Sequence, residues 1–144
     1  MKFEKIIGSW SLISWKTVYD NGRIIFPMGD DAQGHLIYSS DGYMYASLFK
    51  NNREPFKTGE MLTATDYEKI NAWDSYFSYS GRYSCKGNQI DHFVESSMYP
   101  NWLNDNQSRL FTLDGNILIL ETLPQKTKRG TQISRVSWER SSSK

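Results

Sequence analysis

Cysteine and histidine are scarce in this sequence, and their scarcity limits the chemistry it can support. Cys85 is the single cysteine, so an internal disulfide is excluded, and His35 and His92 are the two histidines. These three residues lie in separate segments, without the close spacing that zinc ligands show. We therefore expect neither a metal site nor a cofactor. We expect Cys85 to be a small buried residue rather than a nucleophile paired with His92.

Long apolar runs and an excess of one charge are also missing. No apolar run approaches the roughly 20 residues that span a bilayer, and the start, MKFEKIIGSW, lacks the apolar stretch of a signal peptide. The 17 basic and 16 acidic residues give a net charge of +1, which does not favour nucleic acid or an anionic membrane. No glycine-rich phosphate-binding loop is present. We expect a cytoplasmic monomer or weak homodimer whose partners include neither nucleic acid nor membrane.

Aromatic residues, by contrast, are abundant. They make up 15% of the chain, with five Trp, nine Tyr and seven Phe. Aromatic side chains favour strands and bury much surface, and they also give small ligands flat contact surfaces. A β-rich core and an aromatic binding site are both compatible with this composition.

Turn sequences recur at short intervals and predict an antiparallel β-structure. Asp-Asn-Gly at 20–22, Asp-Gly at 41–42, Gly-Asn at 87–88 and Asp-Gly-Asn at 114–116 each separate strand-like runs. Many short strands joined by hairpins indicate a barrel or sandwich in one domain, residues 1–144. We expect strands near 8–18, 23–28, 33–39, 42–50, 78–86, 89–98, 107–113, 116–122 and 131–140.

One segment has helical rather than strand periodicity. Thr65 and Glu68 fit a capping box, and Tyr67, Ile70, Trp73 and Phe77 recur at three- and four-residue steps. This spacing predicts one short amphipathic helix near 66–77. The polar connection 51–64 before it has the length of a lid or binding loop.

Alternation within the strands predicts which side chains face the interior. In 89–98 the even positions are the more apolar, so His92 and Ser96 are expected to face inward. In 42–50 we assign Met44, Ala46 and Leu48 to the interior, and in 78–86 the face of Tyr79 and Tyr83. Such an interior is too polar for a purely structural core and indicates a small-molecule pocket, for which a barrel of about eight strands is wide enough.

Several segments resemble the bacterial and fungal lipocalin-like domain family, whose members have a calycin-type β-barrel. Gly8-Ser9-Trp10 is the G-x-W of a lipocalin first strand, and 34–44 resembles the family's GYLIYTPDGYM segment. Gly81-Arg82-Tyr83 and the run 92–102, HFVESSMYPNW, match its GRY and H-x-V-E-x-S-x-x-P-N-W segments. The resemblance runs from about Ile7 to Arg140 and implies an all-β, lipocalin-like, antiparallel up-and-down barrel of about eight to ten strands. It also implies a cation–π contact between Trp10 and Arg140.

The function expected from these features is the binding of a mainly apolar or aromatic small molecule inside the barrel. An alternative is an isomerase or cyclase of a biosynthetic intermediate, with His92 as acid/base; whether the barrel is an enzyme stays open. His92 can equally be a core histidine satisfied by a Tyr or Ser hydroxyl, and Arg109 can pair with a ligand carboxylate or with Glu95. The expected ligand-binding residues are Met44, Ala46, Tyr79, Tyr83, His92, Ser96, Trp102 and Arg109.

Overall fold

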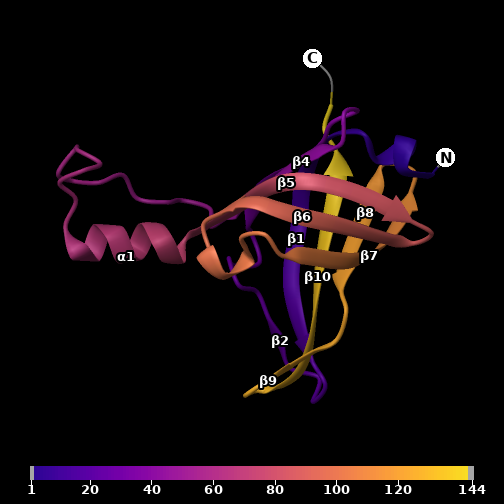
Figure 1. The fold of residues 1–144 in the computed structure, drawn as a ribbon. Helices are drawn as coiled ribbons and strands as arrows, with labels where there is room; N and C mark the ends of the chain where they lie inside the picture. The colour runs from indigo at the N-terminus through magenta and orange to yellow at the C-terminus, as the bar shows by residue number, and fades with distance from the viewer. Residues whose placement is uncertain (1, 143–144) are drawn as a thin grey trace.

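The computed structural model describes residues 2–142, and its main feature is a closed β-barrel (Figure 1). Eight antiparallel strands form the barrel, and the first and last of them pair with each other to close it. In spatial order they are β1 (Gly8–Tyr19), β3 (Gln33–Tyr38), β4 (Tyr43–Phe49), β5 (Tyr76–Lys86), β6 (Gln89–Ser97), β7 (Asn106–Asp114), β8 (Ile117–Thr122) and β10 (Gly130–Arg140). The expected all-β up-and-down barrel is therefore confirmed.

Two short strands extend the sheet beyond the barrel wall. β2 (Ile24–Ile25) pairs with β1, and β9 (Gln125–Thr127) pairs with β10. The run expected at 23–28 forms only the two residues of β2. β9 was not expected, because its sequence, Gln-Lys-Thr, carries no apolar alternation.

The predicted helix is present but shorter than expected. Its capping box is complete, with the Glu68 amide donating to Thr65 Oγ1 at 3.2 Å, and α1 spans Asp66–Asp74. The expected end near 77 is wrong, because Phe77 belongs to β5 and pairs there with Leu48.

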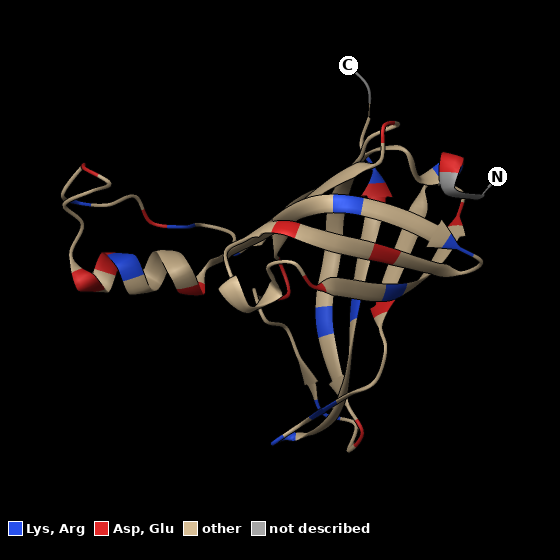
Figure 2. Ribbon diagram, in the orientation of Figure 1, with Lys and Arg blue, Asp and Glu red and all other residues tan. Residues whose placement is uncertain are grey.

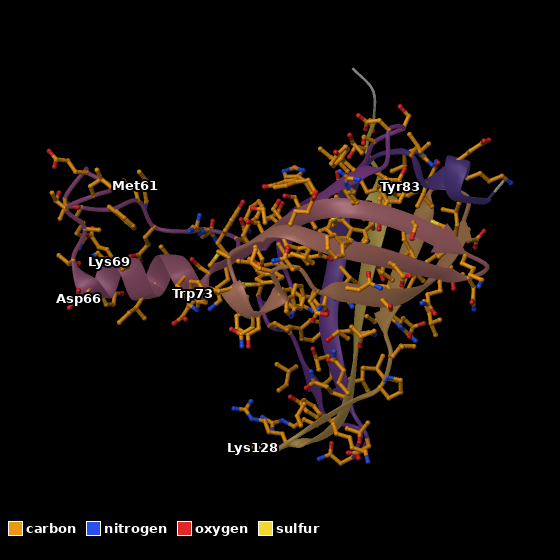
Figure 3. All side chains as sticks on the ribbon, viewed as in Figure 1. Met61, Asp66, Lys69, Trp73, Tyr83 and Lys128 are labelled. Atoms are coloured by element: carbon orange, nitrogen blue, oxygen red, sulfur yellow. The ribbon has the colours of Figure 1, made fainter. Side chains whose placement is uncertain are left out.

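The helix does not pack its apolar face on the barrel. Residues 51–75, which we call the arm, project away from the barrel, and Met61, Asp66, Lys69 and Trp73 are labelled along it (Figure 3). No residue of α1 is buried, and the Trp73 side chain is 51% exposed. The packing of α1 therefore does not explain the amphipathic pattern of this segment.

A short 3-10 helix, η1 (Lys2–Ile6), closes one end of the barrel. Ile6 and Trp10 are fully buried there, and Trp10 Nε1 donates to the Ile6 carbonyl at 2.8 Å. The Arg140 guanidinium lies 4.3 Å from the centre of the Trp10 ring and donates to the carbonyls of Lys5 and Ile7. The expected Trp10–Arg140 contact is confirmed.

The interior next to this closed end is filled by side chains. Leu36, Met44, Ala46, Ile90 and Val94 are among the buried residues of the core cluster.

Charged residues of both signs are interspersed over the strands and the arm (Figure 2). In the described part of the chain, no helix has the length and apolarity to cross a bilayer.

Candidate ligand-binding site

A cavity of about 210 Å³ lies in the barrel interior, between the filled core and the rim formed by η2 (Pro100–Trp102). Seven strands and η2 contribute side chains to it, so the cavity forms only when the barrel closes. It is lined by Trp15, Leu48, Phe77, Tyr79, Trp102, Arg109, Leu120, Thr122, Gln125, Gln132, Ser134, Val136 and Trp138.

The apolar wall of the cavity is built from interlocked aromatic rings. The Trp102 ring meets Phe77 at 5.2 Å and 87°, and meets Tyr79 at 5.2 Å and 83°, so both contacts are edge-to-face. The Trp15 ring also contacts Phe77, with the ring centres 6.4 Å apart and the planes tilted by 38°. Edge-to-face packing favours defined ring orientations, so these contacts set how Phe77 and Tyr79 face Trp102.

Arg109 supplies a positive charge to this wall. Its guanidinium lies 5.8 Å from the centre of the Trp102 ring and donates through Nη1 to the Ser108 carbonyl at 3.0 Å. Glu95 does not pair with it, because Glu95 faces outward and lies 3.7 Å from Arg82. Among residues 2–142, no carboxylate forms an ion pair with Arg109. A ligand is therefore free to use this charge.

Trp138 carries a buried hydrogen-bond donor without a partner. The side chain is 2% exposed, and its Nε1–H is the one buried side-chain polar group in the described part of the chain that has no hydrogen-bond acceptor. Leaving such a donor unpaired costs roughly 1–3 kcal/mol.

A buried Tyr–His–Tyr cluster supports the cavity from the core side. His92 is fully buried on β6, with Nε2 2.7 Å from the Tyr38 hydroxyl and Nδ1 2.8 Å from the Tyr79 hydroxyl. Burial, with a smaller contribution from the nearby Arg109 charge, lowers the pKa of His92 to about 3. Burial also raises the pKa of Tyr38 and of Tyr79. At neutral pH the imidazole is therefore neutral and both hydroxyls keep their protons.

The lipocalin-like domain family matches residues 7–141 of the chain. The chain belongs to this family. The 4'-hydroxy-3'-methoxypropiophenone carrier protein ppsC of Aspergillus oryzae (strain ATCC 42149 / RIB 40) is 30% identical to it over 106 residues, which cover 67% of this chain and 96% of that protein.

Two solved structures are also similar to this lipocalin-like protein. A lipocalin-like protein from Bacteroides uniformis ATCC 8492 has a TM-score of 0.49 at 15% identity, over 94% of this chain and 98% of that one. An uncharacterized protein from Bacteroides eggerthii DSM 20697 has a TM-score of 0.46 at 14% identity, over 94% and 99% of the two chains.

The expected site residues of this lipocalin-like barrel divide into two groups. Tyr79, Trp102 and Arg109 line the cavity. Met44 and Ala46 are buried, as expected from the alternation in β4, but they belong to the filled core and do not line the cavity. His92 is likewise buried behind Tyr79, and its two hydroxyl partners match the expected alternative of a satisfied core histidine.

The inward orientation expected for Ser96 is wrong. A β-bulge shifts the register between β5 and β6, so that Ser80 pairs with Ser96 but Gly81 pairs with Val94. The extra residue reverses the alternation of faces, and Ser96 is exposed. A Cβ on Gly81 would lie 1.9 Å from the Phe93 carbonyl oxygen, so glycine is required opposite the bulge.

Tyr83 points toward the interior but lies away from the cavity. Its hydroxyl donates to the Ser39 carbonyl at 2.6 Å, in the β3–β4 turn, and its ring packs on Tyr38 at 4.8 Å. The label in Figure 3 places it on the barrel far from the arm. The expectation that Tyr83 lines the pocket is therefore wrong. Its hydrogen bond holds the β3–β4 turn instead.

Sequence reasoning missed most of the wall contributed by β1, β8 and β10. Alternate residues of β10 line the cavity, with Gln132 and Ser134 leading into Val136 and Trp138. The period-two pattern of that strand was available in the sequence.

Cys85, the potential metal ligands and the arm lie outside the cavity wall. Cys85 pairs with Ile90 across the β5–β6 hairpin, and burial raises the pKa of its thiol. No group of three or more His, Cys, Asp or Glu side chains in residues 2–142 is arranged to hold a metal ion. A groove of about 390 Å³ lies within the arm, between residues 54–58 and α1, and it is formed independently of the barrel.

Proposed function

We propose that this protein binds and carries a small, mainly apolar aromatic molecule inside its barrel. The observation that carries the proposal is the aromatic cavity together with the Arg109 guanidinium on its wall, which forms no ion pair with a carboxylate of the described residues. A cation without a carboxylate partner beside an apolar cavity is available to an oxygen atom of a ligand. The related protein from Aspergillus oryzae is named as the carrier of an aromatic ketone, which supports the same class of function here.

The size of the cavity restricts the ligand. At about 210 Å³ it is smaller than the roughly 300–1,000 Å³ pockets that hold drug-sized molecules. Its rigid aromatic rings suit the faces and edges of another ring. We therefore propose a ligand with one aromatic ring and short substituents.

The geometry does not favour the alternative of an isomerase or cyclase that uses His92. A general base must reach the proton that it removes, whereas His92 is fully buried and both of its ring nitrogens already have hydrogen-bond partners. The depressed pKa of His92 also makes its imidazole a weak base. A cytoplasmic location, a single domain over 1–144 and a monomeric or weakly dimeric state stay predictions.

The first test is to identify what the protein carries. Native mass spectrometry of protein purified from its own cells, followed by denaturation, would detect a bound molecule and release it for identification. A single-ring aromatic compound in near-stoichiometric amount is the expected result. An empty barrel, combined with no binding of added aromatic compounds, would contradict the proposal.

A titration supplies the second test and a matched control. Added 4'-hydroxy-3'-methoxypropiophenone should change the fluorescence of the cavity tryptophans in a saturable manner. Val136→Phe adds a ring to the cavity wall and should abolish the change. Ile37→Phe adds the same ring to the exposed face of β3 and should leave binding intact.

A further inference from the structure

The direction of the hydrogen bonds around His92 can be worked out from burial. A neutral imidazole has one nitrogen that donates and one that accepts. Each nitrogen of His92 faces a tyrosine hydroxyl, Tyr38 on one side and Tyr79 on the other. One tyrosine must therefore donate to the ring, and the other must accept from it.

Tyr38 is the tyrosine that donates. It is fully buried, and its hydroxyl makes a hydrogen bond to His92 Nε2 and to no other group among residues 2–142. If Tyr38 accepted from Nε2, its own proton would be buried without an acceptor, which is unfavourable. The Tyr38 hydroxyl thus donates to Nε2, and the imidazole proton resides on Nδ1.

Tyr79 consequently accepts from His92 and keeps its own proton available. The Tyr79 hydroxyl has no further acceptor in the described part of the chain. Unlike Tyr38, Tyr79 lines the cavity. Tyr79 is 8% exposed whereas Tyr38 is fully buried, so the Tyr79 O–H is the one with a route to an acceptor such as water or a ligand.

Arg109 is a second donor on the cavity wall. Its guanidinium has no carboxylate partner in residues 2–142. Some polar oxygens are already occupied: Thr122 Oγ1 accepts from the Ser134 amide at 2.9 Å, and Ser134 Oγ bonds Thr17 Oγ1 at 3.1 Å. Gln132 Nε2 donates to Gln125 Oε1 at 3.5 Å, which leaves Gln132 Oε1 as an acceptor at the end of β10 away from Arg140. Next to the core the cavity thus offers the donors of Tyr79 and Arg109.

We propose that the cavity selects aromatic molecules bearing a carbonyl-type oxygen, and that Tyr38 and His92 act as positioning residues that keep Tyr79 a donor. The inference rests on the proposed function, since it names the chemistry that the barrel would recognise. Ketone and carboxylate oxygens share this chemistry. Arg109 adds a preference for the carboxylate only if its charge contacts the ligand.

The test compares ligands that differ at the carbonyl. 4'-Hydroxy-3'-methoxypropiophenone and 2-methoxy-4-propylphenol share ring, hydroxyl, methoxy group and chain length, and the second has a methylene in place of the ketone. An apolar cavity would favour the methylene compound, because burying an unpaired carbonyl is unfavourable. A donor cavity should bind the ketone more tightly by about tenfold in Kd. 4-Hydroxy-3-methoxybenzoate, as a third probe, separates the carboxylate from the ketone.

Variants assign the preference to particular donors. Tyr79→Phe should reduce the ratio of the two Kd values by about threefold or more. The ratio is unaffected by a general loss of contact area, which weakens both ligands alike. Tyr45→Phe is the control, because that hydroxyl lies on the exposed outer face and pairs with Tyr76 at 3.1 Å.

A measurement without ligand tests the positioning residues directly. ¹⁵N NMR of the imidazole should show His92 as the neutral Nδ1–H tautomer, with His35→Gln used for assignment. The Nε2–H tautomer would overturn the inference, even if the tyrosine variants failed to fold. Equal binding of ketone and methylene compounds, or tighter binding of the latter, would also overturn it while leaving the carrier function intact. Failure of all three probes to bind would count against both.

Discussion

Burial of His92 predicts that the protein loses stability in mild acid. His92 has a pKa of about 3 in the folded protein, against about 6.5 for an exposed histidine in the unfolded chain. Between these values the unfolded chain binds a proton that the folded protein does not. The free energy of unfolding is therefore unaffected by His92 above about pH 6.5 and falls as the pH is lowered from 6.5 to 3.

The size of the effect follows from the difference of about 3.5 between the two pKa values. At about 1.4 kcal/mol per pH unit, His92 removes about 3 kcal/mol by pH 4.5, and at most about 5 kcal/mol by pH 3. A small domain has only about 5–15 kcal/mol of stability. This single side chain can therefore decide whether the barrel stays folded in mild acid.

Urea denaturation between pH 7 and pH 4.5 measures the effect. His92→Gln removes the titrating group while keeping an amide that can donate and accept, so its stability should fall less steeply with acid than that of the wild type. His35→Gln removes an exposed histidine and should retain the wild-type slope. Asp91, whose pKa is lowered mainly by its hydrogen bond from Ser108, titrates in all three proteins. Equal slopes in wild type and His92→Gln would refute the reasoning.

Three further substitutions test the packing of the barrel and the independence of the arm. Gly81→Ala places a Cβ 1.9 Å from the Phe93 carbonyl oxygen and should lower the free energy of unfolding by about 3 kcal/mol or more in chemical denaturation. Arg140→Met removes a cation 4.3 Å from the Trp10 ring and its bonds to two backbone carbonyls, which should cost about 2 kcal/mol and lower the Tm in a thermal melt. Trp73→Ala, on a helix with no buried residue, should change the free energy of unfolding by less than about 0.5 kcal/mol.

Each of these substitutions has a control or a contradicting result. Ser80→Ala, next to the bulge, should be far milder than Gly81→Ala. Arg135→Met removes an exposed ion pair of 3.0 Å with Glu121 and should cost less than about 1 kcal/mol. If Arg140→Met lowers the free energy of unfolding no more than Arg135→Met does, the contacts of Arg140 do not stabilise the closed end of the barrel. A large loss of stability in Trp73→Ala would mean that α1 packs on the barrel in solution.

The strand pattern of this barrel could be predicted because its signals are local. Alternation placed Met44, Ala46 and His92 in the interior, and all three are buried. Glycines at the hairpin turns adopt the positive φ that such turns need, with 95° at Gly42 and 58° at Gly115. These preferences act over two to four residues and are therefore visible in the sequence.

The site was predicted only in part, because two of its determinants are not local. The bulge opposite Gly81 reverses the faces of β6, and nothing in the run around Ser96 indicates the extra residue. An inward-facing residue also lines the cavity only where its neighbours leave space. Met44 and Ala46 meet filled core, whereas Leu48, on the same face of the same strand, reaches the cavity.

The sequence by itself determined the barrel, its hairpins, the helix cap and the family. The tertiary structure alone decided where the barrel is empty and which side chains border that space. The physical reason is that alternation and turn preference are properties of single strands, whereas an empty volume depends on side chains from strands far apart in the chain. Trp138 on β10 and Tyr79 on β5 become parts of one cavity wall only when the barrel closes.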